Sequence, residues 1–335
     1  MKFSYCTIPN RPVKTLVDIA VRSEEAGVDL LWIPDEEFYR DPFAVLAAIG
    51  ASTRKLGLGL GITNPYTRHP VQVARAMATV QDMRDEPVIV GIGAGLKHTR
   101  QALAAPDGKF VDVTRDAIVA MKRLFAGETV SMENSVFKIE RAKLDFLPHI
   151  QPKIYVASTH PDAFRMAGEV ADGVIVGNVA EPEAMRQVIG FVEEGIKAAG
   201  RKREDVAVVA WNMILWGDDV DHLAGIIRDM TARTITAAHS KIRALLDLDP
   251  AQVEAIVTRV KAKQFPIGAD LVPNELIAKF AILGSAEACS RRIAALHQAG
   301  ADMVGIRPAG DILKALDYEG NVLALHRAFQ SAMKG

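Results

Sequence analysis

The chain has 335 residues, of which 49% are hydrophobic, and its formal net charge at pH 7 is −1. This length and apolar content suit one α/β barrel with insertions and exceed what a small β-sandwich needs. The near-zero net charge gives no electrostatic reason to expect binding to nucleic acid or to an anionic membrane. We therefore expect small molecules as partners, together with further copies of the chain in a homodimer or larger homo-oligomer.

The cysteine content and the N-terminus bear on compartment and metal binding. Cys6 and Cys289 are too few and too far apart for a disulfide framework or a thiolate metal site. The N-terminal sequence lacks a basic segment followed by a long apolar run, and no stretch has the length and apolarity of a membrane span. We expect a cytoplasmic protein without a metal.

Short apolar runs alternate with longer amphipathic segments along most of the chain, a pattern typical of β-α units and a parallel sheet. Eight units of this kind close a (β/α)8 (TIM) barrel, which we predict as a single domain over residues 1–335. The predicted strands are Lys2–Ile8, Leu30–Ile33, Leu56–Ile62, Pro87–Ile92, Lys153–Ala157, Gly173–Val176, Val206–Leu215 and Met303–Ile306.

The helices that follow these strands show an apolar face and recognisable ends. In the first, Val13–Ala26, one face carries Leu16, Ile19, Ala20 and Ser23, and Gly27 provides a left-handed stop. Further predicted helices are Val71–Met83, Asp112–Phe125 (ended by Gly127), Asp162–Val170 and Ser285–Ala299.

Two segments interrupt the alternation and are predicted insertions. Residues 127–150, after the fourth strand, contain a small hairpin, which we interpret as a lid or an oligomer surface. Residues 218–273, after the seventh strand, are mainly helical. Charged residues of the second insertion either line the mouth of a pocket or belong to solvated helix faces: Arg233, His239, Lys241 and Arg243.

Carboxylates follow the second strand in the stretch Pro34-Asp35-Glu36-Glu37. Barrel active sites lie at the carboxyl ends of the strands, so Asp35 and Glu36 are candidate catalytic residues. The alternative is that these acids are solvated, while Asp41 caps the next helix.

Glycines recur at every second position in the third strand, from Gly57 to Gly61, and again in the turn Gly91-Ile92-Gly93-Ala94-Gly95. Glycine allows another group to approach the backbone closely, so both stretches are candidates for contact with a planar cofactor. Tight packing within the core is the alternative. The second stretch lacks the acidic partner and βαβ context of a dinucleotide fingerprint.

Polar turns follow three later strands. Ser158-Thr159-His160 precedes a helix, whose first N–H groups are suited to a phosphate, and Gly177-Asn178 forms a second turn of this kind. The alternative is that Ser158 or Thr159 only caps the helix. Arg307 follows at the carboxyl end of the eighth strand. We expect it to bind a carboxylate or phosphate there, and the alternative is that it pairs with an acidic neighbour.

The chain resembles the luciferase-like family of flavin and deazaflavin oxidoreductases, and within it the methylenetetrahydromethanopterin reductases that use coenzyme F420. The resemblance covers nearly the whole chain. The segments that carry it are Gly61-Ile62-Thr63-Asn64-Pro65-Tyr66-Thr67-Arg68-His69-Pro70, Gly91-Ile92-Gly93-Ala94-Gly95 and Ala167-Gly168-Glu169-Val170-Ala171-Asp172-Gly173-Val174.

This resemblance implies a cis peptide bond at Gly61-Ile62, in a bulge that backs the cofactor ring. The implied cofactor contacts are Gly61, Ile62, Thr63, Asn64, Gly93, Ala94 and Gly95 at the ring, and Ser158, Thr159, His160, Gly177 and Asn178 at the phosphate. Candidate substrate contacts are Cys6, Leu96, Trp211 and Arg307. Reductases of this kind commonly carry an acid where this chain has Cys6 and another where it has Leu96, and often a histidine where it has Glu36.

The function we predict is hydride transfer between C5 of coenzyme F420 and a small organic or pterin-like substrate. Asp35, Thr63 and Asn64 position the ring, and Asp35 or Glu36 relays a proton. One alternative is an FMN-dependent monooxygenase that uses dioxygen. Another, of a different class, is a non-catalytic protein that binds a flavin or deazaflavin.

Overall fold

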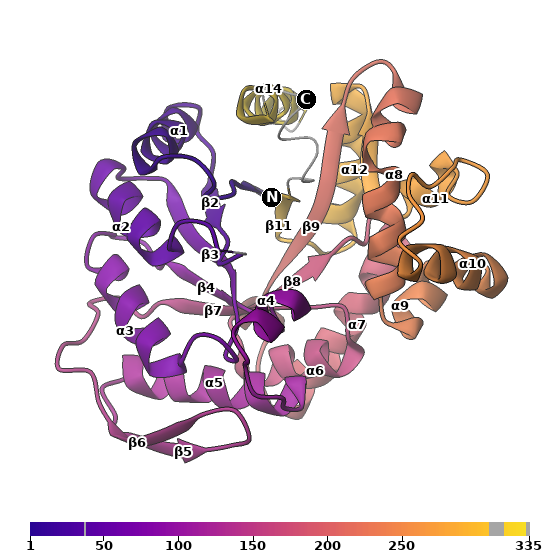
Figure 1. Ribbon diagram of the computed structural model, residues 1–335. Coiled ribbons are helices and arrows are strands. Elements are labelled where there is room, and N and C mark those ends of the chain that lie inside the picture. The colour runs from indigo at the N-terminus through magenta and orange to yellow at the C-terminus, as the bar shows by residue number, and fades with distance from the viewer. Residues whose placement is uncertain (37, 308–317, 333–335) are drawn as a thin grey trace.

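The barrel strands pair in parallel in chain order, and the ring closes between the last strand and the first, where Lys2 lies opposite Met303. The computed structural model, which describes residues 1–36, 38–307 and 318–332, confirms the predicted (β/α)8 barrel (Figure 1). The eight barrel strands are β1 (Lys2–Cys6), β2 (Leu30–Ile33), β3 (Gly57–Thr63), β4 (Ile89–Ile92), β7 (Lys153–Ser158), β8 (Gly173–Gly177), β9 (Ala207–Trp216) and β11 (Met303–Arg307).

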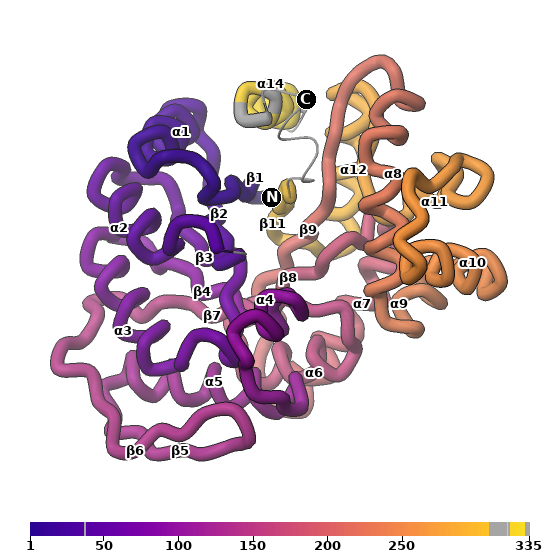
Figure 2. Tube along the Cα trace, viewed as in Figure 1, coloured from indigo at the N-terminus to yellow at the C-terminus, as the bar shows by residue number. Residues whose placement is uncertain are grey.

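A ring of helices surrounds these strands (Figure 2). Proline is the first residue of several of them, where its missing N–H costs no hydrogen bond, and Asp41 caps one through its contacts with the N–H groups of Phe43 and Ala44. Gly27 and Gly127, at φ +77° and +80°, end two others as predicted. The ring consists of α1 (Val13–Glu25), α2 (Pro42–Ser52), α3 (Pro70–Gln81), α5 (Phe110–Phe125), α6 (Pro161–Val170), α7 (Pro182–Ala198), α12 (Ala286–Gln298) and α14 (Tyr318–Ala332).

Apolar side chains form two cores, one between the sheet and the helices and one inside the barrel. The predicted face of α1, from Leu16 to Ser23, is buried in the outer core. The inner core is centred on Trp32, which is fully buried and meets Trp211 edge-on at 5.5 Å between ring centroids. Trp32 also donates a hydrogen bond from Nε1 to Ser4 Oγ at 3.0 Å. This inner core forms the floor beneath the carboxyl ends of the strands.

The glycines of β3 make room for Trp32. A Cβ atom placed on Gly59 would lie 2.3 Å from Trp32 Cε3, and one on Gly61 would lie 2.9 Å from the same atom. A Cβ on Gly57 would lie 2.7 Å from the backbone oxygen of Asp29. Of the two interpretations of this strand, tight packing therefore accounts for the glycine spacing.

An aspartate directly precedes each of β2, β8 and β11 and joins that strand to its neighbour at the end remote from the strands' carboxyl termini. Its Oδ2 atom accepts the N–H of the second residue of the neighbouring strand at 2.7–2.8 Å, and its own N–H donates to the carbonyl of that residue at 2.8–3.1 Å. The same pair of hydrogen bonds thus occurs three times. The pairs are Asp29 with Phe3, Asp172 with Ile154 and Asp302 with Val208.

Residues 127–150 contain a hairpin and residues 218–273 are mainly helical. The antiparallel hairpin of β5 (Val130–Glu133) and β6 (Lys138–Ala142) lies outside α5, and the short α4 (Lys97–Ala102) follows β4 (Figure 1). The 3-10 helix η1 (Arg203–Asp205) precedes β9. The second predicted insertion contains α8 (Val220–Ala237), α9 (Ser240–Leu245) and α10 (Pro250–Lys261), and α11 (Asn274–Ala278) directly follows it. No helix in the described residues has the length and apolarity needed to cross a bilayer.

One strand was not predicted. β10 (Ala281–Gly284) pairs in parallel with residues 213–216 of β9, beyond the part of β9 that pairs with β8. Its four residues are too short a run for periodicity to separate a strand from a buried piece of helix.

Candidate active site

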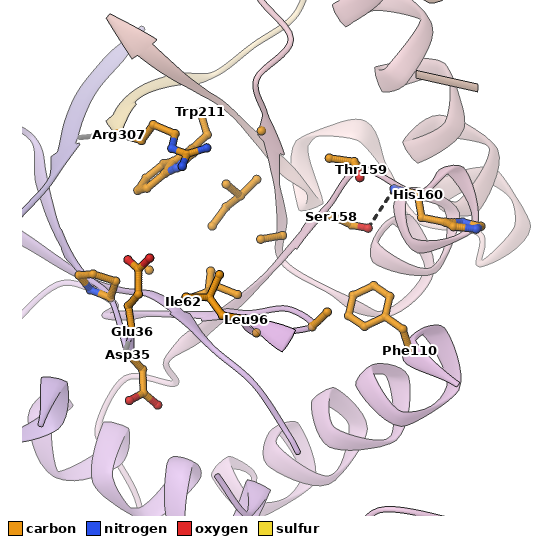
Figure 3. Close-up of a pocket in the computed structure, with 17 residues that line it drawn as sticks. Asp35, Glu36, Ile62, Leu96, Phe110, Ser158, Thr159, His160, Trp211 and Arg307 are labelled. Atoms are coloured by element: carbon orange, nitrogen blue, oxygen red, sulfur yellow. Dashed lines mark hydrogen bonds between the residues drawn. The ribbon is translucent and has the colours of Figure 1, made fainter. Parts of the chain in front are cut away.

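A cavity of about 600 Å³ opens at the carboxyl ends of the barrel strands (Figure 3). Barrel active sites lie at this end. Most of the residues predicted to contact cofactor or substrate line it: Asp35, Glu36, Gly61, Ile62, Ala94, Gly95, Leu96, Ser158, Thr159, His160, Gly177, Trp211 and Arg307. Five predicted residues are absent from the lining: Cys6, Thr63, Asn64, Gly93 and Asn178.

The bulge at the end of β3 forms one wall of the cavity. The peptide bond between Gly61 and Ile62 is cis, as the resemblance implied, and the pairing of β3 with β4 shifts between Leu60 and Thr63. The Ile62 side chain packs against β4, where a Cβ on Gly91 or Gly93 would lie 2.8 or 2.5 Å from it. Gly93 therefore makes room for Ile62. At this position tight packing, and not contact with a cofactor, explains the glycine.

Thr63 and Asn64 are buried behind this wall. Asn64 Oδ1 accepts hydrogen bonds from the N–H groups of Tyr66 and Thr67 at 3.1 and 3.0 Å, which fixes the turn after β3. A Cβ on Gly95, at φ +67°, would lie 2.7 Å from Asn64 Nδ2. Asn64 borders a smaller neighbouring cleft of about 420 Å³. Both residues thus support the wall from behind.

Asp35 and Glu36 point in opposite directions (Figure 3). Both Asp35 carboxylate oxygens accept hydrogen bonds: Oδ2 from Thr63 Oγ1 at 2.7 Å and from Arg68 Nε at 2.9 Å, and Oδ1 from Arg68 Nη2 at 2.9 Å. These hydrogen bonds and the negative charge of Asp35 raise the pKa of Arg68. The Glu36 carboxylate points into the cavity, on the side of Arg307, and Glu37 lies outside the described residues.

Arg307 and Trp211 border the same end of the cavity as Glu36 (Figure 3). Arg307 Nη1 donates a hydrogen bond to Asn178 Oδ1 at 3.2 Å, and the Asn178 N–H donates to the Trp211 carbonyl at 2.7 Å. Asn178 has a left-handed backbone, φ +57°. It therefore holds Arg307 and is not itself part of the cavity wall.

Cys6 lies in the inner core, 3% exposed. Burial strongly raises the pKa of the Cys6 thiol, the negative charge of Glu36 raises it further, and Arg307 lowers it. The thiol stays protonated at neutral pH and is therefore a poor nucleophile.

The opposite end of the cavity carries Ser158 and Thr159. The first N–H groups of α6 already have acceptors, because the His160 N–H donates to Ser158 Oγ and the Asp162 N–H to His160 Nδ1. The predicted phosphate cradle of free backbone N–H groups is thus not seen at these positions. An anion at this end would depend largely on side-chain donors. A Cβ on Gly177 meets no atom within 4 Å, so this position faces open space.

Several residues of the site were not predicted. Pro34, Phe110, Ala157 and Ile175 line the cavity. Arg68, the partner of Asp35, lies inside the quoted segment Gly61–Pro70, but no local pattern pairs it with a carboxylate 33 residues away. Phe110 begins α5 two residues before the predicted start of that helix, and a wider helix boundary would have included it.

The fold and the site together define a class of protein. Its features are a parallel (β/α)8 barrel, a cis peptide bond at the end of the third strand and a cavity beside that bond. The sequence profile described as luciferase-like monooxygenase matches residues 1–303, and the chain belongs to this family. Its relatives include reductases and monooxygenases.

The relatives extend over nearly the whole chain. A 5,10-methylenetetrahydromethanopterin reductase of Methanolobus tindarius is 27% identical over 305 residues, covering 91% of this chain and 93% of the relative. The structure of the coenzyme F420-dependent tetrahydromethanopterin reductase from Methanopyrus kandleri is similar with a TM-score of 0.84, 22% identity and 99% coverage of both chains. Monooxygenase RslO1 from Streptomyces bottropensis is similar with a TM-score of 0.68 and 19% identity, covering 98% of this chain and 97% of that one.

Proposed function

We propose that this chain is a coenzyme F420-dependent oxidoreductase that transfers a hydride between the deazaflavin and a small organic or pterin-like substrate. The observation that carries the proposal is the cavity of about 600 Å³ at the carboxyl ends of the barrel strands, in which the wall at Gly61 and Ile62 adjoins a polar end with Glu36 and Arg307. Support also comes from relatives named as F420-dependent dehydrogenases and from the similar structure of a coenzyme F420-dependent reductase.

The cavity fits a planar cofactor. Its volume of about 600 Å³ falls within the usual range for small-molecule sites. Small or apolar groups at Gly61, Ile62, Ala94 and Ile175 border it, which suits the face of a ring, and the open position at Gly177 leaves space toward the Ser158 end. When bound, coenzyme F420 supplies the hydride donor or acceptor carbon.

The residues of the chain then have distinct roles. Ile62 would shield one face of the ring, and Trp211, Leu96 and Arg307 would contact a substrate on the other face. Glu36 holds or receives the proton of the reacting substrate group, because its carboxylate points into the cavity. Asp35 is a positioning residue, since Arg68 and Thr63 occupy both of its oxygens and its N–H donates to the Ile62 carbonyl.

The test is binding and turnover of the purified protein with F420. We expect F420 to bind and its visible absorption band to bleach with a hydride donor from a panel of secondary alcohols, or reduced F420 to regain that band with methylenetetrahydromethanopterin as hydride acceptor. Tight FMN binding without F420 binding, together with oxygen consumption when a flavin reductase and NADH are added, would replace this proposal with the monooxygenase alternative. Cofactor binding without turnover of any donor would support the non-catalytic one.

A further inference from the structure

Two histidines from distant parts of the chain meet beside the mouth of the cavity. His160 lines the cavity at the start of α6, and His239 comes from the second insertion, immediately before α9. Their ring centroids are 4.3 Å apart, with an interplanar angle of 59°. The His160 ring extends away from the Ser158 side chain, toward the outside of the cavity (Figure 3).

The hydrogen bonds of both rings fix the position of their protons. His160 Nδ1 accepts the Asp162 N–H at 3.2 Å, and His239 Nδ1 accepts the Lys241 N–H at 3.2 Å. A ring nitrogen that accepts a hydrogen bond carries no proton, so each neutral ring carries its proton on Nε2. Within the described ranges, neither Nε2–H has a protein acceptor. The pair therefore presents two neighbouring N–H donors.

The surrounding charges make this place electropositive. Burial lowers the pKa of His239, and the positive charges of Lys241 and Arg243 lower it further, while the negative charge of Asp162 opposes this shift. The Asp162 carboxylate is itself paired with Arg165, at 2.9 Å between Oδ1 and Nη1. His239 thus stays neutral at pH 7 and acts as a hydrogen-bond donor, while the lysine and arginine supply the charge.

We propose that His160, His239, Lys241 and Arg243 form an anion-binding subsite at the mouth of the cavity, for a carboxylate or phosphate at the far end of the bound ligand. The path is continuous, because Ser158 and Thr159 line the cavity between the Ile62 wall and His160. The subsite stands on the histidine pair. Only the assignment of the bound carboxylate or phosphate to the cofactor rests on the proposed function.

The first experiment measures binding of inorganic pyrophosphate to the cofactor-free protein by calorimetry. His239→Asn keeps an acceptor for the Lys241 N–H and removes the Nε2–H donor, so we expect about a tenfold loss of affinity, the size of one hydrogen bond to a charged group. His222→Asn, an exposed histidine of the same insertion, is the matched control and should bind like the wild type. Long-range ¹H–¹⁵N spectra should show Nε2–H tautomers for His160 and His239. Equal binding by wild type and His239→Asn, or no binding by wild type, overturns the subsite.

The second experiment identifies which molecule carries the anion. If the acidic group belongs to the cofactor, the variants His239→Asn and Lys241→Ala should lose affinity for F420 as well as for pyrophosphate. The F420 affinity stays unchanged, while pyrophosphate affinity falls, if the group belongs to the substrate. Failure of the wild type to bind F420, with pyrophosphate binding retained, rejects the proposed cofactor and leaves the subsite intact. Normal F420 binding with pyrophosphate affinity unaffected by His239→Asn rejects the subsite alone.

Discussion

Glycines border the candidate site in two regions, which differ in whether other atoms occupy the space that a side chain would need. Along β3 and β4, the space that a side chain would need is already filled by Trp32 or Ile62. At Gly177, at the end of β8, a Cβ would meet no atom within 4 Å. The first region is a finished wall, whereas the second is open toward the cavity. The difference teaches that glycine content alone does not mark a ligand contact, and that the question is what occupies the missing side chain's place.

The largest effect should follow from adding a methyl group to the filled region. In Gly59→Ala the new Cβ collides with the Trp32 ring, which is fully buried and has Trp211 and Tyr155 close to it. We expect the free energy of unfolding, measured by urea denaturation, to fall by about 3 kcal/mol, at the upper end for overpacked cores. Gly190→Ala, on α7 with no atom within 4 Å of its Cβ, is the control and should not lower stability. A change below about 0.5 kcal/mol in Gly59→Ala, no more than an ordinary surface substitution, would contradict the packing argument.

The two carboxylates of the site give a second comparison, because Arg68 and Thr63 hydrogen-bond to Asp35 while the Glu36 carboxylate points into the cavity. Glu36→Gln should lower turnover about 100-fold with F420 affinity and stability unchanged, because it removes a proton-transfer group in the cavity. Asp35→Asn should instead lower stability by about 1 kcal/mol or less, since Arg68 is 37% exposed and solvent screens the pair. Steady-state kinetics and urea denaturation of both variants test this. The reverse assignment of the two losses would show that Asp35 is the proton relay.

A bulky group in the open region should affect binding alone. We expect Gly177→Leu to weaken F420 binding at least about tenfold, or 1.4 kcal/mol, because the side chain enters the cavity. Its unfolding free energy should stay within about 0.5 kcal/mol of the wild type. Absorbance titration with F420 measures the first quantity. Unchanged affinity would mean that the cofactor does not pass Gly177.

The smallest effect concerns a third glycine, Gly27, whose carbonyl accepts a hydrogen bond from His326 Nε2 at 3.1 Å. Burial of the ring lowers the pKa of His326 below its ordinary value, 6.5. In the unfolded chain this histidine takes up a proton as the pH falls below about 6.5, while in the folded chain it resists protonation. The free energy of unfolding should therefore decrease as the pH falls below 6.5 and should be insensitive to this group above it.

The variant His326→Gln isolates that contribution. Its unfolding free energy should change less between pH 7.5 and pH 5.5 than that of the wild type, by up to about 1.4 kcal/mol for each unit by which the pKa is lowered. Urea denaturation at both pH values provides the measurement. Equal pH dependence in the two proteins would show that His326 does not titrate with unfolding.

Most of the fold could be predicted from the sequence because its signals are local. The eight barrel strands, the buried face of α1 and the stops at Gly27 and Gly127 depend on residues a few positions apart. The strand β10 escaped prediction, since a four-residue run carries too little pattern.

The candidate site could be predicted only in outline. The β-α pattern identifies which strand ends meet around the cavity, and the cis Gly61–Ile62 bond came from family resemblance. The pairing of Asp35 with Arg68, the packing of Ile62 against Gly93 and the contact between His160 and His239 depend on how distant segments meet when the barrel closes. Local sequence patterns do not specify such contacts.

The aspartates that precede β2, β8 and β11 set the stagger between neighbouring strands. A slip of one residue would break both hydrogen bonds of a pair and turn the inner face of the strand outward. Three adjacent strand pairs are thus aligned from the end remote from the cavity. The three aspartates lie at the end remote from the cavity, so substitutions at cavity residues such as Glu36 or Leu96 can alter the chemistry of the barrel while these hydrogen bonds stay in place.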